Sequence, residues 1–256
     1  MPSNNENVGQ CRLCGQQKPL CDSHIVPELA YQPIKNEKNQ IYVAGNKTRI
    51  VQRGYTERLL CRECDTILLS RYETKFNQVW MKTIPPDFRH LRTKPLEDVI
   101  QVDIPDYDSF KLFHLSVFWR AAISIGFKTC PDKCLGPYES ILAEMIRNGN
   151  PGQVGDFPFL GILVIDGNGS PVPQVIQLAQ GQGRFEDRYR YYGMNYAFCD
   201  WTFVVARPGP QWLVDLETRC RNEKIYLLLV VPITQSKMFR WSANIEKRFK
   251  QQAGSP

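Results

Sequence analysis

Two Cys-x-x-Cys pairs near the start of this chain restrict its fold more than any other feature. The first pair is Cys11 and Cys14 and the second is Cys61 and Cys64, with 46 residues between the pairs. Two residues between cysteines allow one tight turn to aim both thiolates at one ion, and two such turns complete the tetrahedral shell that zinc prefers. Because four thiolates leave no open position on the metal, the spacing predicts a structural zinc site.

Two neighbouring residues offer an alternative ligand set for this ion. Cys21 and His24 also have a metal-ligand spacing, so the set could instead be Cys11, Cys14, Cys21 and His24. That set would leave the second Cys-x-x-Cys pair without a function. We therefore favour the cysteine-only site, in which both pairs serve one ion.

Composition and the apolar runs indicate a cytoplasmic protein without a membrane partner. The first ten residues are polar, with neither a basic start nor an apolar run, so no secretory signal is expected. Nine cysteines in a cytosolic chain favour metal ligation over disulfides. The apolar stretch 110–127 is interrupted by His114 and Arg120, and the stretch 225–233 is too short to cross a bilayer.

The order of apolar patterns and turns divides the chain in two. Apolar residues spaced by three and four predict a helix from Leu60 to Trp80, which the prolines at 85 and 86 end. The predicted fold is α+β, with a small zinc-bound module at 1–86 and a larger α+β domain at 87–256. In the second domain we expect helices at 109–127 and 138–147, mostly antiparallel strands at 159–165, 173–178, 196–205 and 225–231, a hairpin turn at 166–169 and a short basic helix at 242–252.

The stretch from residue 35 to residue 62 is the most basic part of the predicted module. It holds seven Lys or Arg residues against two Glu residues, in a chain whose formal net charge is +6. Such a stretch suits a polyanionic partner, although charge runs are also common on surfaces that bind nothing. The nucleic-acid contacts predicted here are Lys47, Arg49, Arg53, Arg58 and Arg62.

Between the cysteine pairs the sequence resembles the HNH endonuclease superfamily. The resemblance is carried by the first pair with Gly15, by the element Ser23-His24-Ile25-Val26-Pro27, and by the two leucines before the second pair. It covers about Cys11 to Phe76. It implies a treble-clef, or ββα-metal, module that hydrolyses phosphodiester bonds of nucleic acid, with DNA as the expected partner and a role such as bacterial defence.

The resemblance also implies catalytic residues. The histidine of the strand, here His24, acts in the superfamily as general base on the attacking water, and a divalent cation, Mg²⁺ or Mn²⁺, stabilises charge on the phosphate. Asp65 corresponds to a ligand of that cation, and Asp22 lies on the same strand face as His24. Two expected polar positions differ, because Ser23 is a poor ligand and Thr56 stands in place of an asparagine.

These departures leave two functions open. The first is a metal-dependent HNH-like endonuclease in which residues 87–256 select the substrate or a protein partner. The second is a catalytically degenerate zinc-binding module that recognises nucleic acid or a protein, and in which His24 only orders the fold. His24 and Asp65 favour the first function, Ser23 and Thr56 favour the second, and we prefer the first.

Two further charged residues carry expectations about pairing. Glu73 lies eight residues after Asp65, about 12 Å along a helix, so one cation cannot bind both. We expect Glu73 to pair with a cation such as Arg71 or a neighbour of Lys75, or to cap a tertiary contact, and Arg120 to find a partner inside the fold.

Overall fold

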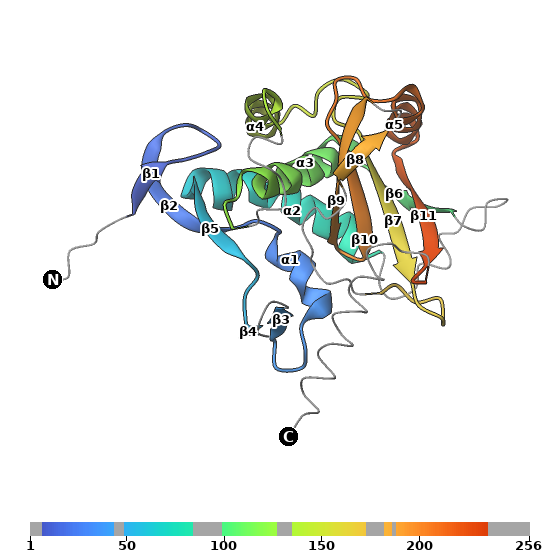
Figure 1. The fold of residues 1–256 in the computed structure, drawn as a ribbon, viewed down its shortest axis with the longest axis horizontal. Coiled ribbons are helices and arrows are strands. Elements are labelled where there is room, and N and C mark those ends of the chain that lie inside the picture. Colours follow the sequence, from blue (N-terminus) through green and yellow to red (C-terminus); the bar gives the residue numbers. More distant parts are fainter. Residues whose placement is uncertain are drawn as a thin grey trace.

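A three-stranded antiparallel sheet followed by a long helix forms the N-terminal part of the protein (Figure 1). The computed structural model describes residues 7–43, 49–83, 99–126, 135–172, 182–185 and 188–234. The sheet has the order β1-β2-β5, with β1 at Val8–Gln10, β2 at Gln17–His24 and β5 at Thr56–Cys61. Between β2 and β5 lie helix α1 (Glu28–Tyr31), the 3-10 turn η1 (Gln32–Ile34) and the small hairpin of β3 (Ile41–Val43) and β4 (Arg49–Val51).

The helix predicted from Leu60 to Trp80 begins directly after β5. It runs as the π-helical turn η2 (Glu63–Leu69), helix α2 (Ser70–Phe76) and a second π-helical turn η3 (Asn77–Met81). Most of the predicted apolar stripe is buried, but Ile67 is 51% exposed and Leu69 is buried instead. Hydrogen bonds in π-helical turns span five residues instead of four, so the buried face drifts away from the α-helical spacing.

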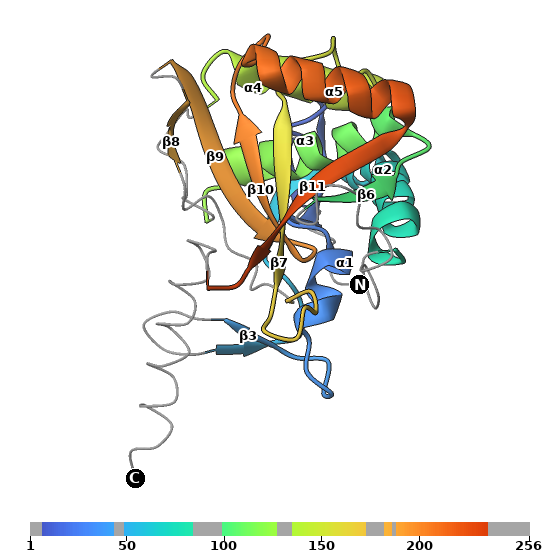
Figure 2. The same cartoon turned by 90° about the vertical axis from the view of Figure 1, so that its right-hand side faces the viewer.

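A six-stranded sheet with three helices forms the rest of the described chain (Figures 1 and 2). Its order is β6-β11-β7-β10-β9-β8, and the β7–β11 pair is parallel while the other pairs are antiparallel. The helices are α3 (Tyr107–Ile123), α4 (Tyr138–Asn148) and α5 (Gln211–Glu223). The strands are β6 (Val99–Asp103), β7 (Phe159–Ile165), β8 (Gln182–Phe185), β9 (Tyr189–Tyr196), β10 (Cys199–Val204) and β11 (Ile225–Pro232).

The α+β class, both predicted helices and the strands at 159–165 and 225–231 are confirmed. The hairpin turn is confirmed too, since the Gly169 N–H donates to the Asp166 carbonyl at 3.0 Å. The strand expected at 196–205 is confirmed as β10 over residues 199–204, but it begins later than expected, because Ala197 and Phe198 have positive φ angles and turn the chain between β9 and β10. The predicted elements at 173–178 and 242–252, and the domain boundary at 86, lie outside the described residues.

Helix α5 and strand β6 were not predicted, and α5 changes the sheet topology. The chain leaves β10 and enters β11, but β7 lies between these two strands. A tight hairpin turn joins only neighbouring strands, so the chain reaches β11 through helix α5, which crosses over β7. As a result β11 pairs with β7 in parallel. The expectation of mostly antiparallel strands holds for the remaining pairs.

Helix α3 joins the two parts of the molecule through one continuous hydrophobic core. It is buried on almost every side and packs on α2 and α4. The rings of Phe76 and Phe113 stack at 3.8 Å between centroids, and Trp80 contacts Trp201 of the large sheet at 5.2 Å. Burying one such ring stabilises the fold by about 1.5–3 kcal/mol. None of the described helices combines the length and the apolar character needed to span a membrane.

Candidate metal centre and adjoining site

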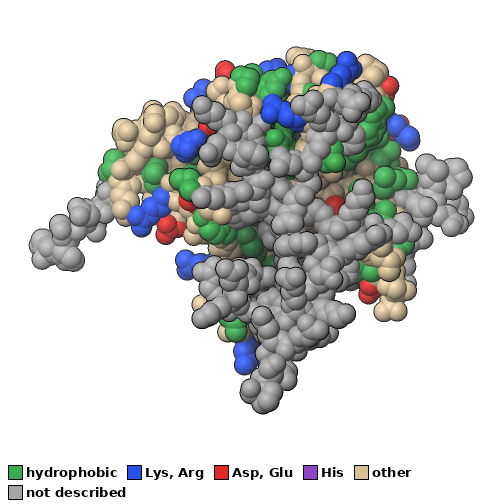
Figure 3. Space-filling model, in the orientation of Figure 1, with side chains coloured by type: hydrophobic (Ala, Val, Ile, Leu, Met, Phe, Trp, Pro, Cys, Tyr) green, Lys and Arg blue, Asp and Glu red, His purple; other side chains and the backbone are tan. Residues whose placement is uncertain are grey.

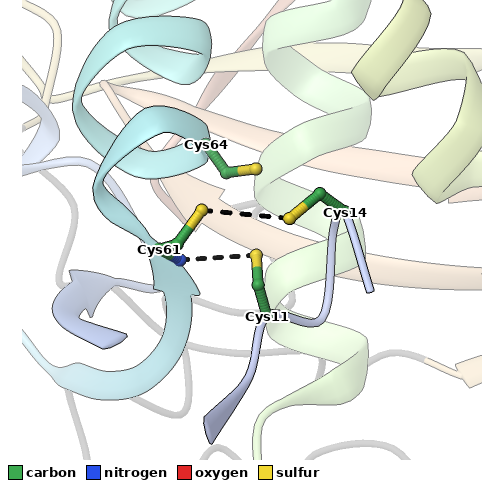
Figure 4. Close-up of side chains that lie close together, drawn as sticks. All are labelled: Cys11, Cys14, Cys61 and Cys64. Carbon is green, nitrogen blue, oxygen red and sulfur yellow. Dashed lines mark hydrogen bonds between the residues drawn. The ribbon is translucent and has the colours of Figure 1, made fainter. Parts of the chain in front are cut away.

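The two Cys-x-x-Cys pairs meet at one point (Figure 4). Cys11 and Cys14 lie in the turn between β1 and β2, Cys61 ends β5, and Cys64 lies in the first turn of η2. Their four Sγ atoms are within 4.8 Å of one another, and those of Cys14 and Cys61 are 3.9 Å apart. Zn–S bonds of about 2.3 Å in a tetrahedron place the sulfurs about 3.8 Å apart. The cluster therefore has the dimensions of a zinc site.

Backbone groups shape the first turn around these thiols. Gly15 has φ +75°, a conformation that glycine adopts at low cost, and its N–H donates to the Cys11 carbonyl at 2.8 Å. The Cys61 N–H donates to Sγ of Cys11 at 3.3 Å, across the two turns. Burial raises the pKa of Cys61 to about 11 and also raises the pKa of Cys64. A metal ion must displace protons from these thiols, so its affinity falls with decreasing pH.

The alternative ligand set does not form. Within the described ranges, the four cysteines are the only group of three or more His, Cys, Asp or Glu side chains that could hold one ion. Cys21 is half-buried on β2, where burial and the nearby Asp65 charge raise its pKa. The His24 ring faces a carboxylate instead of the thiols.

His24 is the last residue of β2, and its ring is partly buried. The side chain is 27% exposed, yet its Nε2 atom is buried and lies 3.1 Å from Oε2 of Glu28. That is an ion-pair distance, although the two groups are not aligned as a hydrogen bond. Burial lowers the pKa of His24; the negative charges of Glu28 and Asp65 oppose this, and the positive charges of Arg120 and Arg53 add to it.

Glu28 was missed in the sequence. It begins helix α1 directly after Pro27. Its carboxylate also forms an ion pair with Lys35 and accepts a hydrogen bond from the Gly54 N–H at 3.4 Å. The signal that could have found it is local. A carboxylate four residues after a strand-ending histidine is within reach of the ring once a helix starts between the two.

Arg120 connects helix α3 to the same site. Its side chain is 1% exposed, and it donates to the backbone carbonyl of His24 at 2.8 Å and to Oε1 of Glu73 at 3.2 Å. The expectation of an internal partner for Arg120 is confirmed. Of the alternatives expected for Glu73, the tertiary contact is the one that forms, because α3 brings Arg120 over the inward face of α2, whereas Arg71 is exposed. Burial raises the pKa of Glu73, and the Arg120 guanidinium opposes that effect.

The other predicted site residues lie at different distances from the His24 ring. Asp65 is half-buried in the first turn of η2, close enough for its charge to act on His24. Thr56 is the direct partner of His24 in the β2–β5 register. Asp22 is 69% exposed, lies in the same unbroken pairing register as His24 and pairs with Arg58 at 3.3 Å. Ser23 is fully buried on the other face.

The predicted nucleic-acid contacts are only partly described. Arg53 and Arg62 are exposed, and Arg58 is engaged by Asp22. Arg49 belongs to β4, and Lys47 lies outside the described residues. On the described part of the face in Figure 3, Lys and Arg side chains are spread among other residues and do not gather into one patch.

Comparisons of this chain with protein-family models, curated proteins and solved structures give no match. The four-cysteine cluster and the surroundings of His24 therefore carry the functional interpretation by themselves.

Proposed function

We propose that this protein is an HNH-like endonuclease that hydrolyses phosphodiester bonds of nucleic acid, with DNA as the expected substrate. The observation that carries the proposal is the position of His24. It ends a strand of a hairpin whose two ends meet at the four-cysteine cluster, and Asp65 follows on the adjoining helix. A structural zinc ion in that cluster, holding a treble-clef module, would keep the hairpin and the helix in this relation.

The His24 imidazole suits the role of general base. Burial lowers its pKa, so the ring is neutral near pH 7 and can accept the proton of a water that attacks the phosphorus atom. Arg53 and Arg62 are exposed on the same module and supply positive charge for the phosphate backbone. Thr56, the partner of His24 in the strand register, places a hydroxyl-bearing residue opposite it on β5.

The divalent cation expected from the resemblance finds few ligands here. Apart from the cysteine cluster, the described residues bring no three ligand side chains together, and Asp22 is engaged by Arg58. Asp65 remains as the residue that would hold Mg²⁺ or Mn²⁺, with substrate oxygens and water supplying the other ligands, as is common for Mg²⁺. Such a cation polarises the phosphoryl oxygens when bound.

Plasmid cleavage by the full-length protein tests the proposal. Supercoiled plasmid is incubated with wild-type protein, His24→Ala and the control His90→Ala, each in Mg²⁺ and in Mn²⁺. We expect cutting by wild type and by the control, and a loss of at least a hundredfold in His24→Ala. Zinc content and thermal unfolding show whether His24→Ala is folded. Equal cutting by all three proteins, or by none in either metal, would refute the His24 mechanism.

A second function is favoured by a specific observation. Ser23 is buried and Asp22 is paired with Arg58, so two side chains beside His24 are engaged elsewhere. A zinc-held module that binds nucleic acid without cutting it accounts for both. Fluorescence anisotropy with labelled duplex DNA, single-stranded DNA and RNA separates the two functions. Tight binding combined with no cleavage supports this alternative, and metal-dependent cleavage that requires His24 excludes it.

A further inference from the structure

We propose that Glu28 is the positioning residue of His24: its carboxylate holds a proton on Nε2, so that Nδ1 is the nitrogen that accepts a proton. The catalytic consequence rests on the proposed function, whereas the choice of ring nitrogen does not. A base oriented by a third group is the general arrangement of activated catalytic side chains.

The burial of the ring distinguishes its two nitrogens. The Nε2 atom is buried, although the side chain as a whole is 27% exposed, so the exposed part of the ring lies at its other atoms. A buried ring N–H needs an acceptor, and Oε2 of Glu28 is 3.1 Å away. Catalytic hydrogen bonds are often poorly aligned before substrate binds, so the 3.1 Å separation fits a hydrogen bond that forms in the active complex.

The Glu28 carboxylate is itself held in place from two sides. Lys35, whose side chain is only 7% exposed, contacts Oε1, and the Gly54 N–H donates to Oε2 at 3.4 Å. A side chain at position 54 would meet the ring of Tyr31 at 2.2 Å, so glycine is required for this close approach of the backbone. Lys35 and the Gly54 N–H therefore fix the orientation of the Glu28 carboxylate next to the His24 ring.

Besides Glu28, three charges among the described residues act on the ring: Asp65 lies on η2, Arg120 on α3, and Arg53 on the loop before β5. Lys35, which follows η1, contacts the Glu28 carboxylate. Of the charges that oppose the effect of burial on the His24 pKa, Glu28 has the largest effect, and its carboxylate lies at ion-pair distance from the ring. Arg120 donates to the backbone carbonyl of His24 and not to its ring, so this contact does not determine which ring nitrogen carries the proton.

Nitrogen-15 NMR of labelled histidine in the full-length protein tests this choice directly. The chain has three histidines, and His24→Ala identifies the His24 signals. In wild type we expect the Nε2–H tautomer. In Glu28→Gln we expect the midpoint of His24 titration to move to lower pH, because a negative charge is lost, with a weaker tautomer preference. The control Glu37→Gln removes an exposed carboxylate of the same segment and should change neither.

The result that overturns the proposal is an unchanged His24 tautomer and titration midpoint in Glu28→Gln. Because that substitution leaves Lys35 buried without its partner, the double variant Glu28→Gln, Lys35→Met is measured in the same way if the single variant is unfolded. Either folded variant gives the answer without any enzyme assay.

The kinetic arm separates this proposal from the proposed function. If wild type cleaves DNA, Glu28→Gln should cut roughly tenfold to a hundredfold more slowly at pH 7, and the rising limb of its pH profile should move to lower pH. A purely structural role would lower activity without moving that limb, and such a result counts against Glu28 as positioning residue. If wild type does not cleave, the nuclease proposal fails while the NMR result still decides the tautomer.

Discussion

Arg120 donates a hydrogen bond of 2.8 Å to the backbone carbonyl of His24, a residue 96 positions earlier in the chain. The same guanidinium reaches Oε1 of Glu73 at 3.2 Å, so one buried side chain of α3 holds both the end of β2 and the middle of α2. The strand end that carries the proposed base is thus fixed from the larger part of the molecule, and not only by the cysteine cluster.

Removing Arg120 should destabilise the protein and disturb the His24 strand end. Arg120→Met leaves Glu73 partly buried without its cation and should lower the free energy of unfolding by about 3 kcal/mol, as breaking such pairs does. The double variant Arg120→Met, Glu73→Gln removes both charges and should recover part of that loss. Urea unfolding of wild type, the single variant and the double variant measures these free energies. A single variant as stable as wild type would contradict a structural role for the pair.

Removing one cysteine of the cluster should release the metal and unfold the N-terminal part. Cys61→Ser leaves three thiols, and because binding free energy in such sites is also folding free energy, most of the stability of this part should be lost. Metal analysis and thermal unfolding check both effects. Cys21→Ser is the control, and it should keep one zinc per chain. Loss of zinc in the control, with retention in Cys61→Ser, would instead support the alternative ligand set.

Acidification should destabilise the protein partly through His114. This ring is fully buried, its Nδ1 lies 2.6 Å from the Tyr196 hydroxyl, and burial holds its pKa well below the ordinary value of 6.5. The unfolded chain therefore binds a proton below about pH 6.5 that the folded chain does not, and stability falls as pH falls, by up to about 1.4 kcal/mol per pH unit.

The matched variant for this pH effect is His114→Phe, which keeps an aromatic ring but cannot take up a proton. Unfolding free energies of wild type and variant are compared at pH 7.5 and pH 5.5, so that contributions shared by both, including proton uptake by the cysteines, cancel. We expect a smaller loss in the variant. Parallel pH dependences would show that His114 does not contribute.

Arg53 and Arg62 should contribute to binding of nucleic acid through phosphate contacts. Each Arg→Ala change is expected to weaken duplex DNA binding without altering sequence preference and to lower the slope of log affinity against log salt by about 1. Anisotropy titrations at several salt concentrations measure this. Arg147→Ala, an exposed cation on α4, is the control. An equal loss in the control would indicate only a general effect of net charge.

Local chemistry was readable from the sequence. The spacing within each Cys-x-x-Cys pair predicted the cluster, because a tight turn alone brings two thiols together. The Asp166 to Gly169 turn and helix α3 followed in the same way, from turn residues and from a long apolar segment. In the two cysteine turns, the Asp166 to Gly169 turn and helix α3, the determining contacts lie within a few residues of one another, and the meeting of the two cysteine pairs followed from the four ligands that zinc requires.

Relations between distant segments were decided only by the tertiary structure. Helix α5 carries the chain past β7 and so sets a parallel strand pair that no local pattern encodes. Arg120 reaches His24 and Glu73 only because α3 packs across α2. The sequence by itself therefore determined the cysteine cluster and most of the elements. Packing determined which charges surround His24, because side-chain burial and pairing depend on segments that meet only when the chain has folded.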